Sequence, residues 1–270
     1  MLMGRIVGVK DKVQLVDVEV SDAEVLAEIS KRAFDTDINI GSPSKGGPLG
    51  YDDPEYQVKV MEYFDCYRII LNDKTVGGIY VASKNPGHKM LENIFVDPNH
   101  HRQGIGTRAM ELAAERYPQA RLWTLGTPEW NIRTTSFYEK LGFSQVGWDQ
   151  GEPESPRRWY EKTVDPSQPY EMTPTGELKD GMKDVDVEGE ILEKGVAREV
   201  RSKRRRWQTL SVANAGFGDN FGRIVLVLWN KQIKQVKVGD RMRVENGYVT
   251  SYRGIKQLNV GRAGRLIHLL

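Results

Sequence analysis

The sequence predicts two domains, an α/β domain at residues 1–163 and an all-β domain at residues 177–270. In the first, strand patterns alternate with helix patterns. In the second, strand-like runs of about 6 to 10 residues follow one another between Gly, Asp and Asn turns. Three prolines and many polar residues separate the two patterns, and we assign residues 164–176 as a linker.

Charge separates the same two halves of the chain. Residues 1–170 contain 20 Lys+Arg and 25 Asp+Glu, a net charge of −5, whereas residues 171–270 contain 19 and 12, a net charge of +7. We therefore expect the two halves to meet different partners, and the basic second domain is the candidate for binding a polyanion.

Location is predicted from what the sequence lacks. No apolar run approaches the roughly 18 residues of a membrane span. Met1–Asp11 has neither the apolar segment nor the cleavage site of a signal peptide. Together with a single cysteine, Cys66, expected to be buried packing, these features predict a cytoplasmic protein.

Each element of the α/β domain has a local signal. Val13–Val18 alternates like a strand, and Ser21 with Glu24 forms a capping box that predicts a helix to about Phe34. Asn72 and Asp73 are typical turn residues. The other expected elements are a Gly/Pro-rich loop at 41–54 followed by a short helix, strands at 67–71, 76–82, 90–96 and 122–125, and helices at 104–117 and from 131 to about 141.

A glycine turn at the start of a helix is the strongest chemical signal. In LENIFVDPNHHRQGIGTRAMELA, residues 91–113, a strand stops at Asp97 and a helix begins at Gly104 and Gly106. Glycines let a backbone approach a ligand, and the N–H groups that open a helix attract phosphate oxygens. A second segment, NIRTTSFYEKLGF at 131–143, predicts a helix with Gly142 just after its end.

With both segments in this order, residues 13–163 resemble the GNAT superfamily of N-acetyltransferases. HRQGIG at 101–106 resembles the family's coenzyme A motif, with His101 in place of the usual Gln or Arg, and 131–143 resembles its second cofactor motif. The resemblance implies an α/β (α+β) fold with a mixed central sheet and acetyl-CoA as cofactor. It implies contacts with the cofactor at Ile94, Phe95, Val96, Arg102, Gln103, Gly104, Ile105, Gly106, Thr107 and Asn131; for Asn131, helix capping is the alternative.

Acetylation of an amine needs a base for the amine and an acid for the departing thiolate. By the same resemblance, Glu92 stands in the position of the base and Tyr138 in that of the acid. The alternatives are that Glu92 faces solvent or pairs with an arginine, and that Tyr138 packs in the core. His100 and His101 lack the nearby cysteines or spaced carboxylates of a metal site, so no metal is expected.

The acceptor is less defined by the sequence. The loop at 41–55 lies where the family builds its acceptor wall, and the acids around it favour a cationic amine, although charged loops are commonly just solvated. If the enzyme works at nucleic acid, the acceptor would be a lysine or N-terminus of a bound protein or a polyamine, with a nucleobase as the less favoured choice. The acids are Asp35, Asp37, Asp52 and Asp53.

The basic domain interleaves aromatic residues with cations, a combination that stacks bases while following a phosphate backbone. LVLWNK, ENGYVTSYRG and QLNVG resemble strand motifs of archaeal-type single-stranded-DNA-binding OB-folds, over Leu178–Ile267. The resemblance implies that the rings stack on bases. The alternative is that they fill the barrel, although other apolar residues are available for its interior: Val225, Val227, Val236, Val238, Val244 and Leu258. The candidate nucleic-acid-binding residues are Lys203, Arg204, Arg205, Arg206, Trp229, Tyr248, Tyr252 and Arg253, with Phe217 and Phe221 as weaker ones.

The favoured hypothesis is an N-acetyltransferase that its OB-fold brings to single-stranded nucleic acid or to proteins bound there. In one alternative, the OB-fold carries the function and the acetyltransferase fold is a coenzyme sensor or scaffold. In another, the OB-fold docks a protein substrate and binds no nucleic acid.

Overall fold

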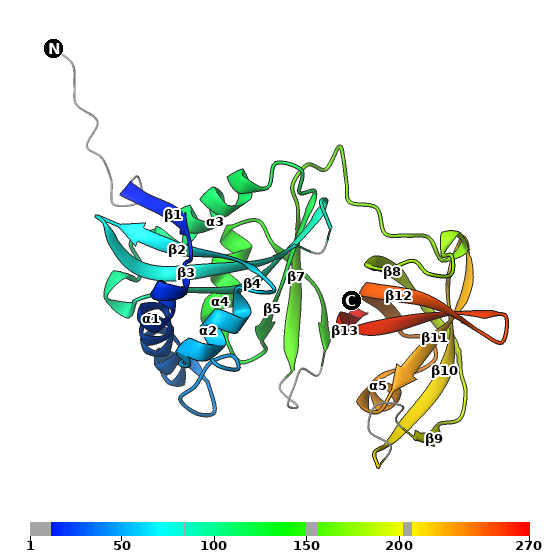
Figure 1. Ribbon diagram of the computed structural model, residues 1–270. Coiled ribbons are helices and arrows are strands. Elements are labelled where there is room, and N and C mark those ends of the chain that lie inside the picture. Colours follow the sequence, from blue (N-terminus) through cyan, green and yellow to red (C-terminus); the bar gives the residue numbers. More distant parts are fainter. Residues whose placement is uncertain (1–11, 84, 150–155, 202–206) are drawn as a thin grey trace. The chain divides into compact units, whose positions relative to one another are not determined.

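The computed structural model describes residues 12–83, 85–149, 156–201 and 207–270 (Figure 1). The chain divides into two compact units, which are described separately. Unit 1 comprises Met1–Ser144 and Tyr160–Tyr170, and unit 2 comprises Gln145–Trp159 and Glu171–Leu270. Within the described ranges, no helix is both long and apolar enough to cross a membrane.

Unit 1 is built on a mixed sheet. Its first four strands are antiparallel neighbours, the fourth and fifth are parallel, and a last strand follows the fifth. This confirms the predicted mixed central sheet. The strands, in sheet order, are β1 (Val13–Asp17), β2 (Asp65–Leu71), β3 (Lys74–Ser83), β4 (His88–Val96), β5 (Leu122–Pro128) and β7 (Arg157–Thr163).

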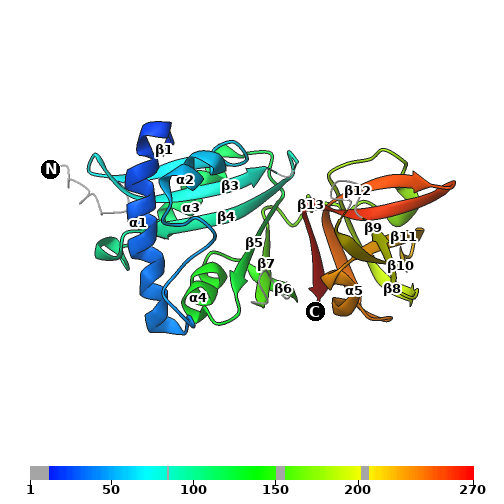
Figure 2. The same cartoon turned by 60° about the horizontal axis from the view of Figure 1, so that its bottom comes forward.

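Helices cover both faces of this sheet (Figure 2). On one face, α1 (Ala23–Asp35) packs Leu26 and Ile29 against Tyr80 and Phe95, with α2 (Pro54–Val60) beside it. On the other, α3 (Ile105–Arg116) and α4 (Ile132–Lys140) contribute to a core that also holds sheet residues such as Ile79 and Val81. Alternation along β3 sends neighbouring residues to opposite faces, which is why one strand serves both cores. Short 3-10 turns are η2 (Val20–Asp22), η3 (Thr36–Ile40) and η4 (Pro98–His100).

Two of the local signals are confirmed and one is wrong. Asn72 and Asp73 have φ of 48° and 62° and form the two-residue turn between β2 and β3. Gly142, with φ of 86°, follows α4, and the next N–H reaches back to the Tyr138 carbonyl. Ser21, however, lies inside η2, and the capping box is formed by Glu19 and Asp22 instead.

Unit 2 contains a closed five-stranded barrel, and among its described strand pairs only β11 and β13 run parallel. This confirms the predicted all-β OB-fold barrel. Its strands are β8 (Val185–Lys194), β10 (Thr209–Asp219), β11 (Gly222–Trp229), β12 (Arg241–Tyr252) and β13 (Ile255–Leu269). The accompanying elements are β6 (Ser144–Asp149), whose Trp148 pairs with His268 of β13, β9 (Arg198–Arg201), η5 (Thr175–Glu177) and the short helix α5 (Lys231–Gln235), which the sequence did not indicate.

The barrel core differs from the expected one along β11. Ile224, Leu226 and Leu228 point inward, so Val225 and Val227 lie on the outer face, and Val238 is 61% exposed. The period of two along a strand allows only one of the two interleaved sets inside, and the larger set occupies the core. The expected core residues Val236, Val244 and Leu258 are inside. Phe217, a weaker stacking candidate, is fully buried there as well.

The end of the predicted linker is fixed to the barrel. The Thr173 N–H donates to the Asp186 carbonyl at 2.7 Å. Thr175 donates to the Asp219 carboxylate from its N–H at 2.8 Å and from its hydroxyl at 2.6 Å, and Thr175 is almost completely buried. Residues 173–175 therefore belong structurally to unit 2.

Candidate functional site

The first candidate site lies where β4 and β5 separate. Their parallel register joins His88–Leu91 to Leu122–Leu125, and among the described residues the ladder does not continue along residues 92–96. On its other edge β4 stays paired to β3 as far as Val96, opposite Gly77. The backbone edge of residues 94–96 that faces β5 is therefore not used by the sheet, and an extended ligand can pair with such an edge.

The glycine turn follows β4 and opens α3. Gly104 has φ of 78° and precedes the first helical residue, Ile105, while Arg102 also has positive φ, at 60°. A β-carbon on Gly106 would lie 3.4 Å from the ring of Phe137, close to the limit of ordinary contact. The turn thus places backbone N–H groups at the start of a twelve-residue helix, an arrangement that attracts anions.

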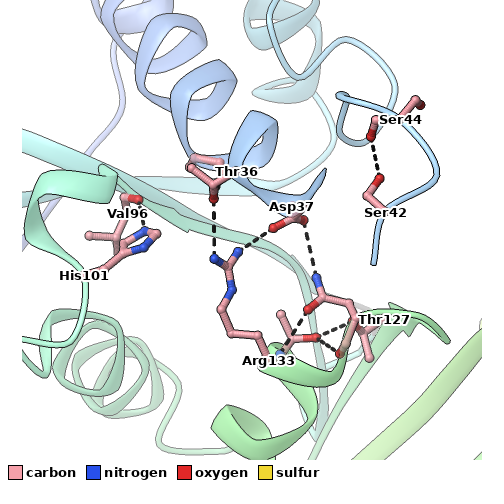
Figure 3. A network of polar contacts seen from close by, with 11 residues as sticks. Thr36, Asp37, Ser42, Ser44, Val96, His101, Thr127 and Arg133 are labelled. Carbon is pink, nitrogen blue, oxygen red and sulfur yellow. Dashed lines mark hydrogen bonds and ion pairs between the residues drawn. The ribbon is translucent and has the colours of Figure 1, made fainter. Parts of the chain in front are cut away.

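His101 contacts the predicted cofactor edge. The Asp97 N–H donates to the Val76 carbonyl of β3 at 2.7 Å, so the Val96 carbonyl of the same peptide points the opposite way, toward the opening. There Nε2 of His101 lies 2.7 Å from it (Figure 3). Because a carbonyl only accepts, this ring nitrogen carries the proton. No group of three or more His, Cys, Asp or Glu placed to hold a metal occurs in the described part of the chain.

Glu92 is the extra residue of a β-bulge. Asn93 pairs with Tyr80 and Leu91 with Val81, which leaves Glu92 without an opposite residue on β3. A bulge bends the strand and re-aims the side chain at that position, and it falls where β4 leaves β5. Glu92 is half-buried, so it does not simply face solvent, and its role as base stays a prediction.

Tyr138 lies in α4 and is only 8% exposed. Its ring contacts those of Phe137, Phe143 and Tyr160, so the packing role is confirmed. Burial raises the pKa of the phenol above its ordinary value, and the nearby Asp37 carboxylate adds to this effect. A phenol of ordinary pKa is already protonated at neutral pH, so this shift does not by itself favour proton donation, and the role of Tyr138 as acid stays a prediction.

A polar cluster holds α4 in place (Figure 3). Asn131 caps the helix, since its Oδ1 accepts from the Thr134 N–H at 3.2 Å, and its Nδ2 donates to Asp37 at 3.4 Å. Arg133 donates to Asp37 and, at 3.4 Å, to the Thr36 hydroxyl. The capping role of Asn131 is thus confirmed, and contact with a cofactor stays a prediction.

Asp37 and Arg133 tie the connection after α1 to the helix that carries Tyr138. Burial raises the pKa of Asp37 above its ordinary value, and the positive charge of Arg133 opposes that rise. The sequence analysis missed Arg133, and its position two residues after Asn131 in a helix's first turn was the only signal for it.

The acids expected to form a negative acceptor wall are mostly engaged within unit 1. Asp35 accepts from Lys31 at 2.9 Å and from the Tyr51 hydroxyl at 3.0 Å, while Asp53 caps α2. Asp37 pairs with Arg133, and only Asp52 is left with a long 3.9 Å contact, to Lys31. Cys66 is partly buried, and burial raises the pKa of its thiol to about 12, so the thiol stays protonated.

The second candidate site is the outer face of three adjacent barrel strands. Tyr248 of β12, Asn259 of β13 and Val227 of β11 stand opposite one another in one row. Their sequence neighbours Val249, Leu258 and Leu226 face the core, so this row faces outward. Thr250, Gln257 and Val225 form the next row.

The three predicted aromatics border this outer face. Tyr252 and Tyr248 are 54% and 38% exposed, and Trp229, two residues beyond Val227, is half-buried. The guanidinium of Arg253 lies 5.4 Å from the centre of the Tyr252 ring. The alternative that these rings fill the barrel is therefore wrong, and their stacking role stays a prediction. The predicted basic run Lys203–Arg206 lies outside the described residues.

Two known families match this chain, one in each predicted domain. Residues 42–143 match the acetyltransferase (GNAT) family, and the glycine turn and bulge lie within that range. Residues 181–268 match the family of Ssb-like single-stranded DNA binding proteins with an OB fold. The chain therefore joins a GNAT-family domain to an Ssb-like OB-fold domain, as the resemblances implied.

Individual relatives each match about a third of the chain. The single-stranded DNA binding protein Ssb of Saccharolobus solfataricus is 35% identical over 86 residues, which are 32% of this chain and 56% of that protein. The uncharacterized protein YrkN of Bacillus subtilis is 37% identical over 82 residues, 30% of this chain and 44% of its own length. The chain thus spans about half the length of these curated relatives.

Solved structures similar to this chain include two acetyltransferases. One from Thermus thermophilus is 16% identical, with a TM-score of 0.47, over 57% of this chain and 97% of its own. The PaiA N-acetyltransferase of Thermoplasma acidophilum, solved with coenzyme A, is 15% identical, with a TM-score of 0.45, over 56% of this chain and 99% of its own.

Proposed function

We propose that this chain is an acetyl-CoA-dependent N-acetyltransferase that acts on an amine, and that its OB-fold brings it to single-stranded nucleic acid or to proteins bound there. The observation that carries the enzymatic part is the opening between β4 and β5, with the Glu92 bulge at its start and the glycine turn at its end. The strand β4 thus carries both the backbone edge of residues 94–96, which could bind an extended cofactor, and the Glu92 carboxylate, which could act on an amine.

The residues present fit acetyl-CoA. Residues 102–107 would hold its pyrophosphate, since Gly104 turns the chain into α3 and no side chain from Gly104 or Gly106 blocks the approach. The edge of residues 94–96 that faces β5 would pair with the pantetheine arm. An arm that bonds to the Val96 carbonyl would have to replace the hydrogen bond that His101 makes there. When bound, the cofactor supplies an activated acetyl group and a thiolate leaving group.

The chain's own side chains would handle the protons. Glu92 would take a proton from the acceptor ammonium, directly or through water, because only the neutral amine is a nucleophile. Tyr138 would donate its phenol proton to the departing thiolate, because a phenol is protonated at neutral pH. Asn131, Asp37 and Arg133 would orient α4 and so the Tyr138 hydroxyl.

The nucleic-acid part of the proposal rests on the outer barrel face. Tyr248, Tyr252 and Trp229 offer aromatic surface beside Arg253, in the half of the chain with a net charge of +7. Base stacking on such rings tolerates any sequence, whereas base faces are hidden in a duplex. We therefore propose that single strands bind here in preference to duplex.

A thiol-release assay with the full chain tests the enzymatic part. Acetyl-CoA is offered with lysine peptides, protein N-termini, polyamines and nucleobases, with and without a single-stranded oligonucleotide. We expect turnover on at least one amine, and faster turnover on a nucleic-acid-bound acceptor when the oligonucleotide is present.

Gly104→Glu is the matched variant, because it places a side chain and a negative charge at the proposed phosphate site. We expect it to abolish coenzyme binding in calorimetry while binding of an oligonucleotide stays unchanged. Equal coenzyme affinity in both proteins would place the cofactor elsewhere.

A further inference from the structure

Asn259 is a buried polar residue in the middle of the outer barrel face. It stands between Tyr248 and Val227 in the register of β12, β13 and β11. Its side chain is on the opposite side of β13 from the core residue Leu258, yet it is only 6% exposed. A polar side chain that is nearly buried at the centre of this face can recognise a base only if its orientation is fixed.

Both donor hydrogens of this amide are used within the barrel. Nδ2 of Asn259 lies 3.1 Å from the Thr250 hydroxyl oxygen and 3.1 Å from the Gln257 carbonyl oxygen. Because the Gln257 carbonyl only accepts, the nitrogen and not the oxygen must face it, and this fixes the direction of the amide.

The amide therefore presents an acceptor only. No donor faces Oδ1 within the part of the chain that the structure describes, and this oxygen is not among the atoms sealed from solvent without a partner. An accepting oxygen of fixed direction beside stacking rings selects for a ligand N–H group.

We propose that Asn259 reads the edge of a base stacked on this face and favours bases with an exocyclic amine, cytosine over uracil or thymine. Cytosine offers an amino group where uracil offers a carbonyl, and the one N–H on that edge of uracil lies between two carbonyl oxygens that the Asn259 oxygen would repel. The inference rests on the proposed binding of single strands and adds base preference to it. Thr250 acts as a positioning residue, since its hydroxyl accepts one of the two amide hydrogens.

Anisotropy titrations of the full chain with two oligonucleotides of equal length test this proposal, one of deoxycytidine and one of deoxyuridine. These differ only on the base edge, so stacking area and backbone charge are matched. We expect cytosine to be favoured about 2- to 10-fold, the range of one hydrogen bond. Asn259→Ala should bring the ratio close to one, mainly by weakening the cytosine strand.

Two further variants separate the possible outcomes. Thr250→Val should lower the ratio without opening the buried centre of the face, which guards against an Asn259→Ala protein that fails to fold. Trp229→Ala should weaken both strands equally and keep the ratio. Binding of both strands with equal affinity, or a preference that survives in both Asn259→Ala and Thr250→Val, overturns the inference alone. Absence of binding to either strand overturns the nucleic-acid part of the proposed function and the inference with it.

Discussion

The opening between β4 and β5 and the outer face of the barrel are built on different principles. The first is made largely of backbone: a bulge at Glu92, an edge with which no described strand pairs and a turn at Gly104. The second is made of side chains that regular alternation sends outward, such as Tyr248 and Tyr252. A backbone site is damaged by adding atoms, whereas a side-chain site is damaged by removing them. Each site is therefore tested by a different kind of substitution.

In the first site, the side chains of Tyr138 and Glu92 would transfer protons. We therefore expect the largest effect of any substitution on the reaction rate at these two residues. Tyr138→Phe and Glu92→Gln should each lower the rate about 10²- to 10⁴-fold, because each removes an acid or a base. Coenzyme affinity should change little, since backbone groups supply most of it. Steady-state kinetics with the true acceptor, together with calorimetry, measures both quantities.

Tyr160→Phe is the control for this prediction. Tyr160 is another fully buried tyrosine in the same aromatic cluster, and its hydroxyl donates to Thr135 at 3.4 Å. Its loss should leave the rate within a few-fold of the original. A Tyr138→Phe protein as active as Tyr160→Phe would reduce Tyr138 to a packing residue and leave the first site without an acid.

For the barrel face, removal of one ring should have the next largest effect. Stacking contributes roughly 1 to 3 kcal/mol per base, so Trp229→Ala or Tyr252→Ala should weaken binding of a single strand about 5- to 150-fold. Tyr63→Ala is the control, because Tyr63 is a ring 74% exposed that belongs to unit 1 and not to the barrel. Equal losses in all three variants, or none, would speak against a localised stacking face and favour docking of a protein.

The smallest effect is expected on stability, from the ion pair between Asp37 and Arg133 that holds α4 in place. Arg133→Met should destabilise unit 1 at pH 7 by about 1–2 kcal/mol, because the buried Asp37 carboxylate loses its cation while Arg133 itself is partly solvated. Burial already raises the pKa of Asp37, and removal of Arg133 raises it further.

The pH dependence of this loss follows from the sign of that shift. With a folded-state pKa above the unfolded value, the contribution of Asp37 to stability is fully present below the unfolded pKa and is lost as pH rises through the folded one. The difference in Tm between the two proteins should thus shrink as pH falls from 7 toward 4. A difference that stays constant with pH would mean that packing, not charge, explains the effect of Arg133.

Local chemistry explains what was predictable in the fold. The turn at Asn72 and Asp73 and the helix end at Gly142 require positive φ, which few residue types adopt readily, so the sequence marks them. The helix start at Ser21 was wrong because Glu19 and Asp22 make the same reciprocal bonds two residues earlier, and short-range signals do not rank such competitors. The helix α5 was not predicted because its five residues are too few to show a helical hydrophobic period.

By itself, the sequence determined the two-domain order, the strand and helix alternation, the glycine turn and the identity of the aromatic residues, since these depend on residues near one another in the chain. The tertiary structure decided what depends on register. Only the pairing of β3 with β4 makes Glu92 a bulge, and only the pairing of β11 with β13 puts Val227 outside and Asn259 at the centre of the face. Likewise, Arg133 meets Asp37 across 96 residues of chain. A one-residue change in register exchanges the two faces of a strand, and along β11 both interleaved sets of residues are apolar, so the local pattern does not decide between them.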